Sequence, residues 1–277
     1  MRPTMVYQSR IFNDKWIDHA RMNSPETSWA RAVIEMFDSS GQVYLSTLRL
    51  WFDRFPLSSK QKRGLHVRLE SLRDDEHLGG ANELAWWAFM LREGLKGVPL
   101  PPSTAPRPDF QLKPPVDCLV EVSTLNVSQQ DKAKLETGAA VALDHAETIR
   151  RVLGKLTAEK LRQLKYAADH GKPSVLVFFD YTTWSGSCTL FFRTLAQFLL
   201  GNQLGFNSFP PELSAIVYLE RRVLLDGRIA LSRHRSAVYY NPLALYPLSV
   251  ETFASLNQFR LQLVFVESRS TEQWILL

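Results

Sequence analysis

The sequence predicts an α/β fold in which a mixed central sheet is flanked by helices and preceded by a helical N-terminal region. Three observations support this prediction. Apolar residues recur at helical spacing through the first 78 residues. Beyond residue 80, helix-like and strand-like patterns alternate along the chain. One of these patterns, SVLVFFDYT at 174–182, is the continuous apolar run that is typical of a central strand covered on both faces.

The N-terminal region, residues 1–78, is expected to be mainly helical. Helical spacing is clear in SWARAVIEMF and in STLRLWFDRF, and Pro25 and Pro56 interrupt it. The next stretch, SSKQKRGLHVRLESLRDDEH, begins with a serine that can cap a helix and mixes basic residues with leucines. Its charges fit either a solvated helix face or a nucleic-acid contact. The basic residues considered for that contact are Lys60, Lys62, Arg63 and Arg68.

Residues 79–277 are expected to form the α/β domain. A helix is predicted from about residue 82 to residue 93, ending at Gly94, and two short strands follow a Pro-rich connection. A polar loop then leads into one helix, and a second helix is capped by Thr157 and closed by Gly171. The remaining predicted elements are the strand at 174–182, a helix in LFFRTLAQFLLG, and strands in SAIVYLERR and SAVYYNP.

Composition excludes several classes of protein. A hydrophobic content of 45% is that of a folded chain and not of a disordered one. The two cysteines, Cys118 and Cys188, are too few for a disulfide framework, and we interpret them as buried thiols. The first residues lack the apolar core of a secretory signal, so a cytoplasmic location is the default expectation. The net charge of +5 suits a polyanionic partner without requiring one.

Two acids stand in the strand-like segments of RPDFQLKPPVDCLVEVST at 107–124. A hairpin through residues 113–115 would lay the strand that carries Asp109 beside the strand that carries Glu121. Glu121 would share its face of the strand with Leu119 and Ser123. Burying an ionised carboxylate is costly unless a cation or hydrogen bonds accompany it. The two acids are therefore expected to face either water or a common positive charge.

Two converging carboxylates also suggest a metal site. Hard oxygen donors, a neighbouring backbone carbonyl and water molecules are the usual ligands of Mg²⁺, or of Mn²⁺, in phosphate chemistry. Asp109 and Glu121 would supply the carboxylates, and Val122 would supply the carbonyl. The histidines of the chain, by contrast, lack metal-ligand spacing.

The order of these motifs resembles the core of the PD-(D/E)XK nuclease superfamily. The resemblance covers roughly residues 80–180 and rests on Glu83 in ANELAWWAFMLREG, then PDF, VEVS, AEKLRQL and PSVLVFF. It implies a restriction-endonuclease-like core with metal-dependent phosphodiesterase activity on DNA. In that case Asp109 and Glu121 bind Mg²⁺, and Glu83 adds a third carboxylate. SAIVYL and the Asn241-Pro242 pair are also similar to the tails of uncharacterised bacterial relatives.

One position departs from the superfamily pattern. The pattern has a lysine two residues after the second acid, whereas this chain has Ser123. Either another lysine has taken over the role or the enzyme is weakened or inactive. Lys160 and Lys165 border opposite edges of the apolar stripe of the following helix, and the resemblance favours Lys160. Gln163, on the same helix, is a candidate for positioning water.

Three functional classes follow from these patterns. The favoured hypothesis is a Mg²⁺-dependent nuclease that acts on DNA. The first alternative is a nuclease fold that has lost its activity and binds nucleic acid or another protein. The second is a structural protein in which PDF and EVS occur by chance. A serine hydrolase is disfavoured, because WSGSC at 184–188 lacks the G-x-S-x-G spacing.

Overall fold

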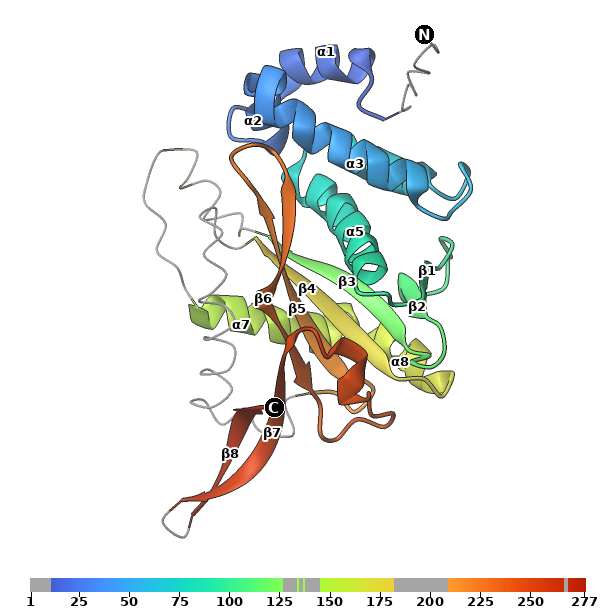
Figure 1. Cartoon of the computed structure of the whole chain (residues 1–277), viewed down its shortest axis with the longest axis vertical. Coiled ribbons are helices and arrows are strands. Elements are labelled where there is room, and N and C mark those ends of the chain that lie inside the picture. Colours follow the sequence, from blue (N-terminus) through green and yellow to red (C-terminus); the bar gives the residue numbers. More distant parts are fainter. Residues whose placement is uncertain (1–10, 127–133, 135–136, 138–144, 182–208, 267–268) are drawn as a thin grey trace. The chain divides into compact units, whose positions relative to one another are not determined.

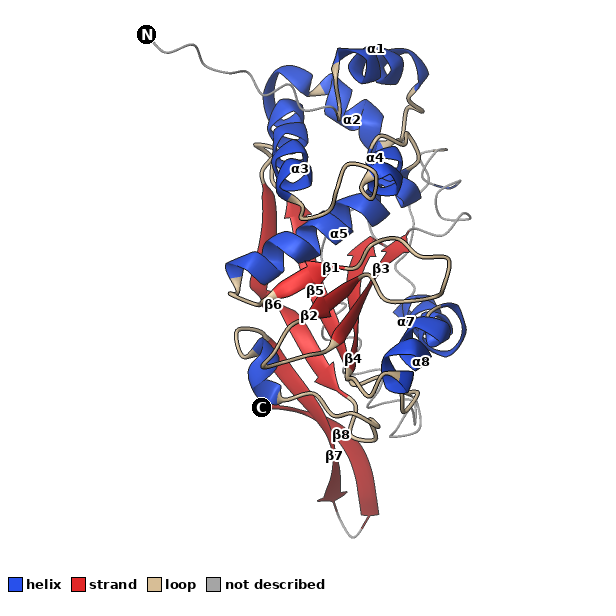
Figure 2. Ribbon diagram, turned by 90° about the vertical axis from the view of Figure 1, so that its right-hand side faces the viewer, coloured by secondary structure: helices blue, strands red, loops and turns tan. Residues whose placement is uncertain are grey.

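Helices precede a mixed sheet in this protein, as Figures 1 and 2 show. The structure is a computed structural model that describes residues 11–126, 134, 137, 145–181, 209–266 and 269–277. Its internal contacts divide the chain into two units. The first unit comprises residues 1–88 and 222–230, and the second comprises residues 89–221 and 231–277. The described residues contain no helix that is both long and apolar enough to cross a membrane.

The first unit is helical, which confirms the predicted helical N-terminal region. Asn13 and Ser28 cap its first two helices by accepting hydrogen bonds from the backbone N–H groups of Trp16 and Arg31. Its elements are α1 (Asp14–Asn23), α2 (Trp29–Glu35), the π-helical turn η1 (Phe37–Gly41), α3 (Gln42–Arg54), α4 (Arg63–Leu69) and most of α5 (Asp74–Arg92).

Helix α5 begins earlier than the sequence predicts. It starts at Asp74 and not near residue 82, because its acidic first turn favours the N-terminal end of the helix dipole. It continues through Gly79 and Gly80, two residues that ordinarily disfavour a helix. A Cβ atom on Gly80 would lie 3.2 Å from Leu69 Cγ, so the glycine lets α5 approach α4 closely. Gly94, with φ +70°, follows the end of the helix as predicted.

A buried histidine joins four of these helices, α2, α3, α4 and α5. His77 is fully buried, its Nδ1 lies 2.7 Å from the Leu69 carbonyl oxygen, and its Nε2 lies 2.7 Å from the Tyr44 hydroxyl. The ring of Trp29 stacks on the imidazole, with centroids 3.3 Å apart. Because a carbonyl can only accept, Nδ1 carries the proton, and in the neutral ring Nε2 accepts from the hydroxyl of Tyr44.

Eight strands form one mixed sheet within the described residues, in the order β1 to β8. The pairs β1–β2, β2–β3 and β7–β8 are antiparallel, whereas β3–β4, β4–β5 and β6–β7 are parallel. This confirms the mixed α/β sheet and adds β1, β7 and β8 to the strands that the sequence predicts. The strands are β1 (Gly97–Pro99), β2 (Phe110–Leu112), β3 (Leu119–Asn126), β4 (Ser174–Tyr181), β5 (Ala215–Val223), β6 (Ile229–Tyr240), β7 (Asn257–Val266) and β8 (Arg269–Leu276).

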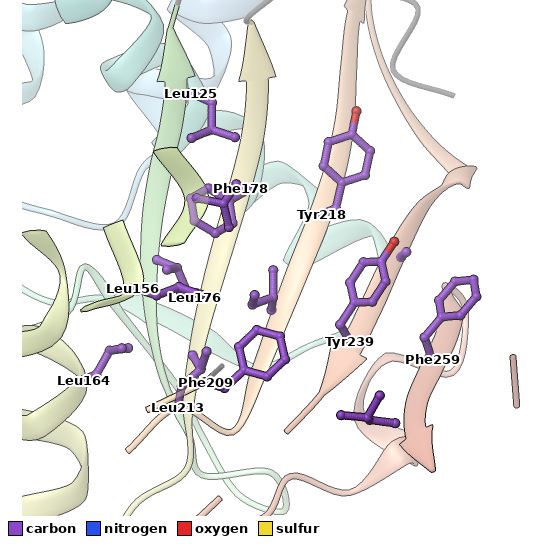
Figure 3. Packing of buried hydrophobic residues seen from close by; sticks show 14 residues of the cluster. Leu125, Leu156, Leu164, Leu176, Phe178, Phe209, Leu213, Tyr218, Tyr239 and Phe259 are labelled. Atoms are coloured by element: carbon purple, nitrogen blue, oxygen red, sulfur yellow. The ribbon is translucent and has the colours of Figure 1, made fainter. Parts of the chain in front are cut away.

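Helices connect the parallel strands β3 and β4, as a parallel pair requires. Helix α7 (His145–Gly154), the π-helical turn η2 (Lys155–Glu159) and helix α8 (Leu161–Asp169) lie on one face of these strands (Figure 2). Leu156 and Leu164 from this layer pack with Leu125, Leu176 and Phe178 from the sheet, as Figure 3 shows. Glu121 and Ser123 alternate with Val122 and Thr124 along β3 and therefore share the face of Leu125.

The predicted cap of α8 is wrong. Thr157 lies inside η2, where its hydroxyl donates to the Leu153 carbonyl at 2.9 Å, so it cannot cap the helix. Helix α8 begins at Leu161, with Lys160 in the capping position. Gly171, at φ +66°, closes it as predicted. The predicted helix in LFFRTLAQFLLG, the segment WSGSC and Cys188 lie outside the described residues, whereas Cys118 is buried, which raises the pKa of its thiol to about 12.

The turn between β5 and β6 is part of the helical unit, and one of its glycines packs closely against η1. Gly227 has φ +81°, and a Cβ atom there would lie 1.8 Å from the Ser40 carbonyl oxygen in η1.

We therefore expect Gly227→Ala to destabilise the protein by at least about 2 kcal/mol, through backbone strain and the clash together. The control is Gly79→Ala inside α5, where no atom crowds the new methyl group. That control should gain about 0.5–1 kcal/mol. Denaturant unfolding measures both, and equal effects would contradict this account of the turn.

Candidate functional site

The hairpin of β2 and β3 brings the two predicted acids together. Phe110 pairs with Val120 and Gln111 with Leu119. Asp109 stands at a bend just before β2, and its carboxylate accepts a hydrogen bond from the backbone N–H of Val122, the residue after Glu121. Two carboxylates held close together repel each other. The arrangement therefore calls for a nearby cation.

The turn of this hairpin is fixed by a polar cluster. Asp117 adopts a left-handed conformation, with φ +41°, which aspartate tolerates better than most residues. Its carboxylate accepts hydrogen bonds from Gln111 Nε2 at 3.0 Å and from Lys172 Nζ at 2.6 Å. The hydrogen bond from Lys172 holds the pKa of Asp117 below its ordinary value. This cluster joins β2, the turn and the segment before β4, and it sets the register that aligns the acids.

Asp109 immediately precedes β2 and is held against β3. Its Oδ2 accepts a hydrogen bond from the backbone N–H of Val122 at 2.9 Å. Its own carbonyl accepts from the N–H of Leu100 at 2.7 Å, which continues the pairing of β1 with β2. The backbone of β3 therefore holds the carboxylate of Asp109, and the residue after β1 holds its main chain.

Glu121 is paired with Lys160. The Glu121 side chain is 5% exposed, and its Oε1 lies 2.5 Å from Lys160 Nζ. The Lys160 side chain is itself only 22% exposed. A charge-assisted hydrogen bond of this length between buried groups is among the stronger polar contacts in proteins. The start of α8 thus delivers an ammonium group to the middle of the sheet.

The ammonium responds to both acids. Burial by itself lowers the pKa of Lys160, because it disfavours the charged form. The charge and hydrogen bond of Glu121, together with the charge of Asp109, outweigh burial and leave the pKa of Lys160 above its ordinary value. Asp109 and Glu121 therefore share a positive charge, which is the second of the two arrangements that the sequence allows for them.

The other predicted residues of this site lie on β3 and α8. Ser123 is buried, two residues beyond Glu121 on the same face of β3. Gln163 is half-buried, and its Oε1 is buried with no hydrogen-bond partner among the described residues. Lys165, the alternative to Lys160, is exposed. The geometry therefore brings Asp109, Glu121 and Lys160 together and leaves Lys165 on the surface.

Glu83 and two of the predicted nucleic-acid contacts have partners inside the first unit. Arg68 donates to both carboxylate oxygens of Glu83, through Nη1 to Oε1 and through Nη2 to Oε2, the latter at 2.9 Å. Lys62 is buried, and its Nζ donates to the carbonyls of Phe52 at 2.6 Å and Asp53 at 3.2 Å.

These contacts give both basic side chains a structural role. Lys62 satisfies carbonyl groups at the C-terminal end of α3, and burial lowers its pKa. Arg68 ties α4 to Glu83 of α5 by a two-pronged ion pair. Lys60 and Arg63, in contrast, are exposed, as a nucleic-acid contact requires.

The donor chemistry of the pair Asp109 and Glu121 fits a hydrated Mg²⁺ or Mn²⁺ ion. Both side chains offer hard oxygen atoms, and these ions commonly take one or two carboxylates and keep water for their other positions. Within the described ranges, no group of three or more His, Cys, Asp or Glu side chains is arranged to hold a metal ion. The site therefore provides a two-carboxylate set.

Comparison with known proteins gives no relative for this chain. No family model matches it, and no curated protein or solved structure is a significant match. The assignment to the PD-(D/E)XK superfamily therefore stays a hypothesis. Any functional conclusion depends on the geometry of the residues themselves.

The Glu121–Lys160 ion pair allows a stability prediction. Lys160→Met leaves a buried carboxylate without this cation and should cost about 3–5 kcal/mol of unfolding free energy. Adding Glu121→Gln should recover part of that loss, so that the double-mutant cycle shows a coupling above about 1 kcal/mol. The control cycle uses Lys155 and Glu159, a pair whose carboxylate side is 62% exposed, where coupling should stay near 0.5 kcal/mol. Urea denaturation measures all variants, and an additive Lys160 cycle would contradict the assignment.

Proposed function

We propose that this protein is a metal-dependent phosphodiesterase that cuts nucleic acid, most simply DNA. One observation carries the proposal, namely the two carboxylates that the β2–β3 hairpin brings together and that act on one half-buried ammonium. An acid pair with a neighbouring lysine is the constellation that the sequence motifs PDF and VEVS resemble. The helix α5, the first three strands, the helices α7 and α8, and β4 also follow one another in the order of that superfamily.

The two acids and Lys160 have different roles in this proposal. Asp109 and Glu121, with the carbonyl of Val122, would hold Mg²⁺, which when bound polarises a phosphoryl oxygen and lowers the pKa of a coordinated water. The raised pKa of Lys160 keeps its ammonium charged at neutral pH, so Lys160 cannot take a proton from the attacking water. Its role is instead to orient Glu121 and to offset negative charge that develops on the phosphate.

Two further residues have supporting roles in this proposal. The buried Oε1 of Gln163 can only accept a hydrogen bond, which suits the orientation of a water molecule. The hydroxyl of Ser123 lies on the face of Glu121 and offers a polar group without charge. Since neither residue is a strong base, the proton released by the water must pass to solvent or to the phosphate itself.

One observation favours a second candidate function. Lys160 already neutralises Glu121 directly, and an ammonium in that place can substitute for the charge of a metal ion. The fold would then be a nuclease that has lost its activity and binds nucleic acid or a protein. DNA binding without cleavage distinguishes this alternative from the first proposal.

The proposal predicts metal-dependent cleavage of DNA. The purified protein should cut DNA with Mg²⁺ or Mn²⁺, and a chelator, Asp109→Asn or Glu121→Gln should abolish the cut, because each removes the ion or the charge that holds it. The surface control Arg228→Ala, which removes an exposed ion pair with Asp226 in the turn after β5, should cut normally. Cleavage that persists in a chelator, or in both acid variants, contradicts the proposal of a metal-dependent nuclease. Binding with a steep salt dependence and no cleavage supports the second candidate.

Lys160 provides a separate kinetic test. Lys160→Ala should lower turnover on the order of a hundredfold while metal affinity changes little, because a contact to developing charge acts on the rate. Adding Ser123→Lys should restore part of the activity by returning a cation to the face of Glu121. The pH profile of the unsubstituted protein should show no loss of rate from Lys160 between pH 6 and about 9, since its pKa is raised. A Lys160→Ala variant that stays folded and cuts at the normal rate contradicts this role and turns attention to Lys165.

A further inference from the structure

Arg107, close to the candidate site in the chain, has a buried donor without an acceptor among the described residues. Its side chain is half-buried, and its Nε is buried with no hydrogen-bond partner in the part of the chain that the structure describes. Nor does Arg107 form an ion pair with any described residue. A guanidinium group stays charged at all ordinary pH values. An unsatisfied buried donor costs about 1–3 kcal/mol, and more when it belongs to a charged group.

The chain places Arg107 close to the acids. Arg107 lies two residues before Asp109, and Pro108 restricts it to extended conformations. The carboxylate of Asp109 accepts a hydrogen bond from the backbone N–H of Val122, the residue after Glu121. The long side chain of Arg107 therefore starts within a few residues of the candidate site.

With a metal ion bound, the charges around Asp109 and Glu121 would favour binding of an additional anion. Lys160 brings one positive charge to the two carboxylates. A bound divalent ion would bring more positive charge than the negative charge that Lys160 leaves unbalanced. The guanidinium of Arg107 would then be a further positive charge without a partner. The guanidinium fork matches the oxygens of a phosphate group better than any other side chain does.

We propose that Arg107 is a substrate-binding residue that holds a backbone phosphate of the nucleic acid beside the scissile bond. This inference rests on the proposed function and names a contact that the sequence motifs do not include. When the substrate binds, its phosphate accepts a hydrogen bond from Arg107 Nε. Binding therefore removes the free-energy cost of leaving this buried donor unsatisfied.

Salt dependence tests the contact. Binding of a fluorescent 20-base-pair DNA duplex is measured against KCl concentration in the Glu121→Gln background, which should not cut the probe. Adding Arg107→Ala should weaken binding about tenfold and reduce the slope of log affinity against log salt by about 0.9, the value of one phosphate contact. Arg107→Lys should keep the slope but bind more weakly, because the point charge remains and the fork is lost. In the cutting protein, Arg107→Ala should raise KM more than it lowers kcat.

A matched control and thermal midpoints separate binding from folding. Arg31→Ala removes the same charge from a surface ion pair in α2 and should leave slope and KM unchanged. If Arg107→Ala folds with an unchanged slope and KM, the inference is overturned while the nuclease proposal survives. If Arg107→Ala does not fold, Arg107→Lys decides by the same criterion of weaker binding at unchanged slope. If the unsubstituted protein neither binds nor cuts DNA, both the inference and the proposed function fail.

Discussion

The ion pair between Glu121 and Lys160 is the constraint on which the centre of this fold depends. β3 pairs with β2 on one side and β4 on the other, and nearly all of its side chains are buried. An acid in such a strand needs a cation from the layer that covers it. The π-helical turn η2 ends at Glu159 and leaves Lys160 at the start of α8, where its ammonium reaches Glu121. The irregular junction between α7 and α8 is thus the feature that supplies the charge.

Stability alone does not account for this arrangement. A buried ion pair is often no better than apolar side chains of similar volume, and a second carboxylate close to the first adds repulsion. Asp109, Glu121 and Lys160 nevertheless occupy a face that also carries Leu125, in a layer packed with Leu156, Leu164 and Phe178. Groups that break the local pattern of a core are typical of functional sites. Because these buried charges cost stability, their presence supports a functional role for this face of the sheet.

Local patterns in the sequence were enough for the hairpin but not for Lys160. Alternation placed Glu121 with Ser123, and the turn after residue 112 predicted the pairing. Helical periodicity put Lys160 inside a helix that in fact begins only at Leu161, so it did not predict the junction from which Lys160 reaches Glu121. Element ends were harder to predict, since α5 continues through Gly79 and Gly80, and the close approach of Gly80 to Leu69 is a tertiary contact that no local pattern shows. Strand β7 has a readable alternation in NQFRLQL and was missed. The contacts of Lys62 with α3 and of Arg68 with Glu83 join residues that no local pattern connects.

Charge balance at the hairpin has a consequence for how nucleic acid would be recognised. Asp109 and Glu121 are matched by Lys160 and, on the inference above, by Arg107, so the face is close to neutral before a metal ion binds. A neutral face gives a phosphate little electrostatic attraction. A divalent ion makes the same face positive, and the phosphate then meets the ion, the ammonium and the guanidinium together. Binding at the reactive phosphate would thus depend on the metal, whereas exposed residues such as Lys60 and Arg63 would contribute attraction that does not. Coupling substrate binding to the metal in this way favours engagement of the scissile phosphate only when the site is complete.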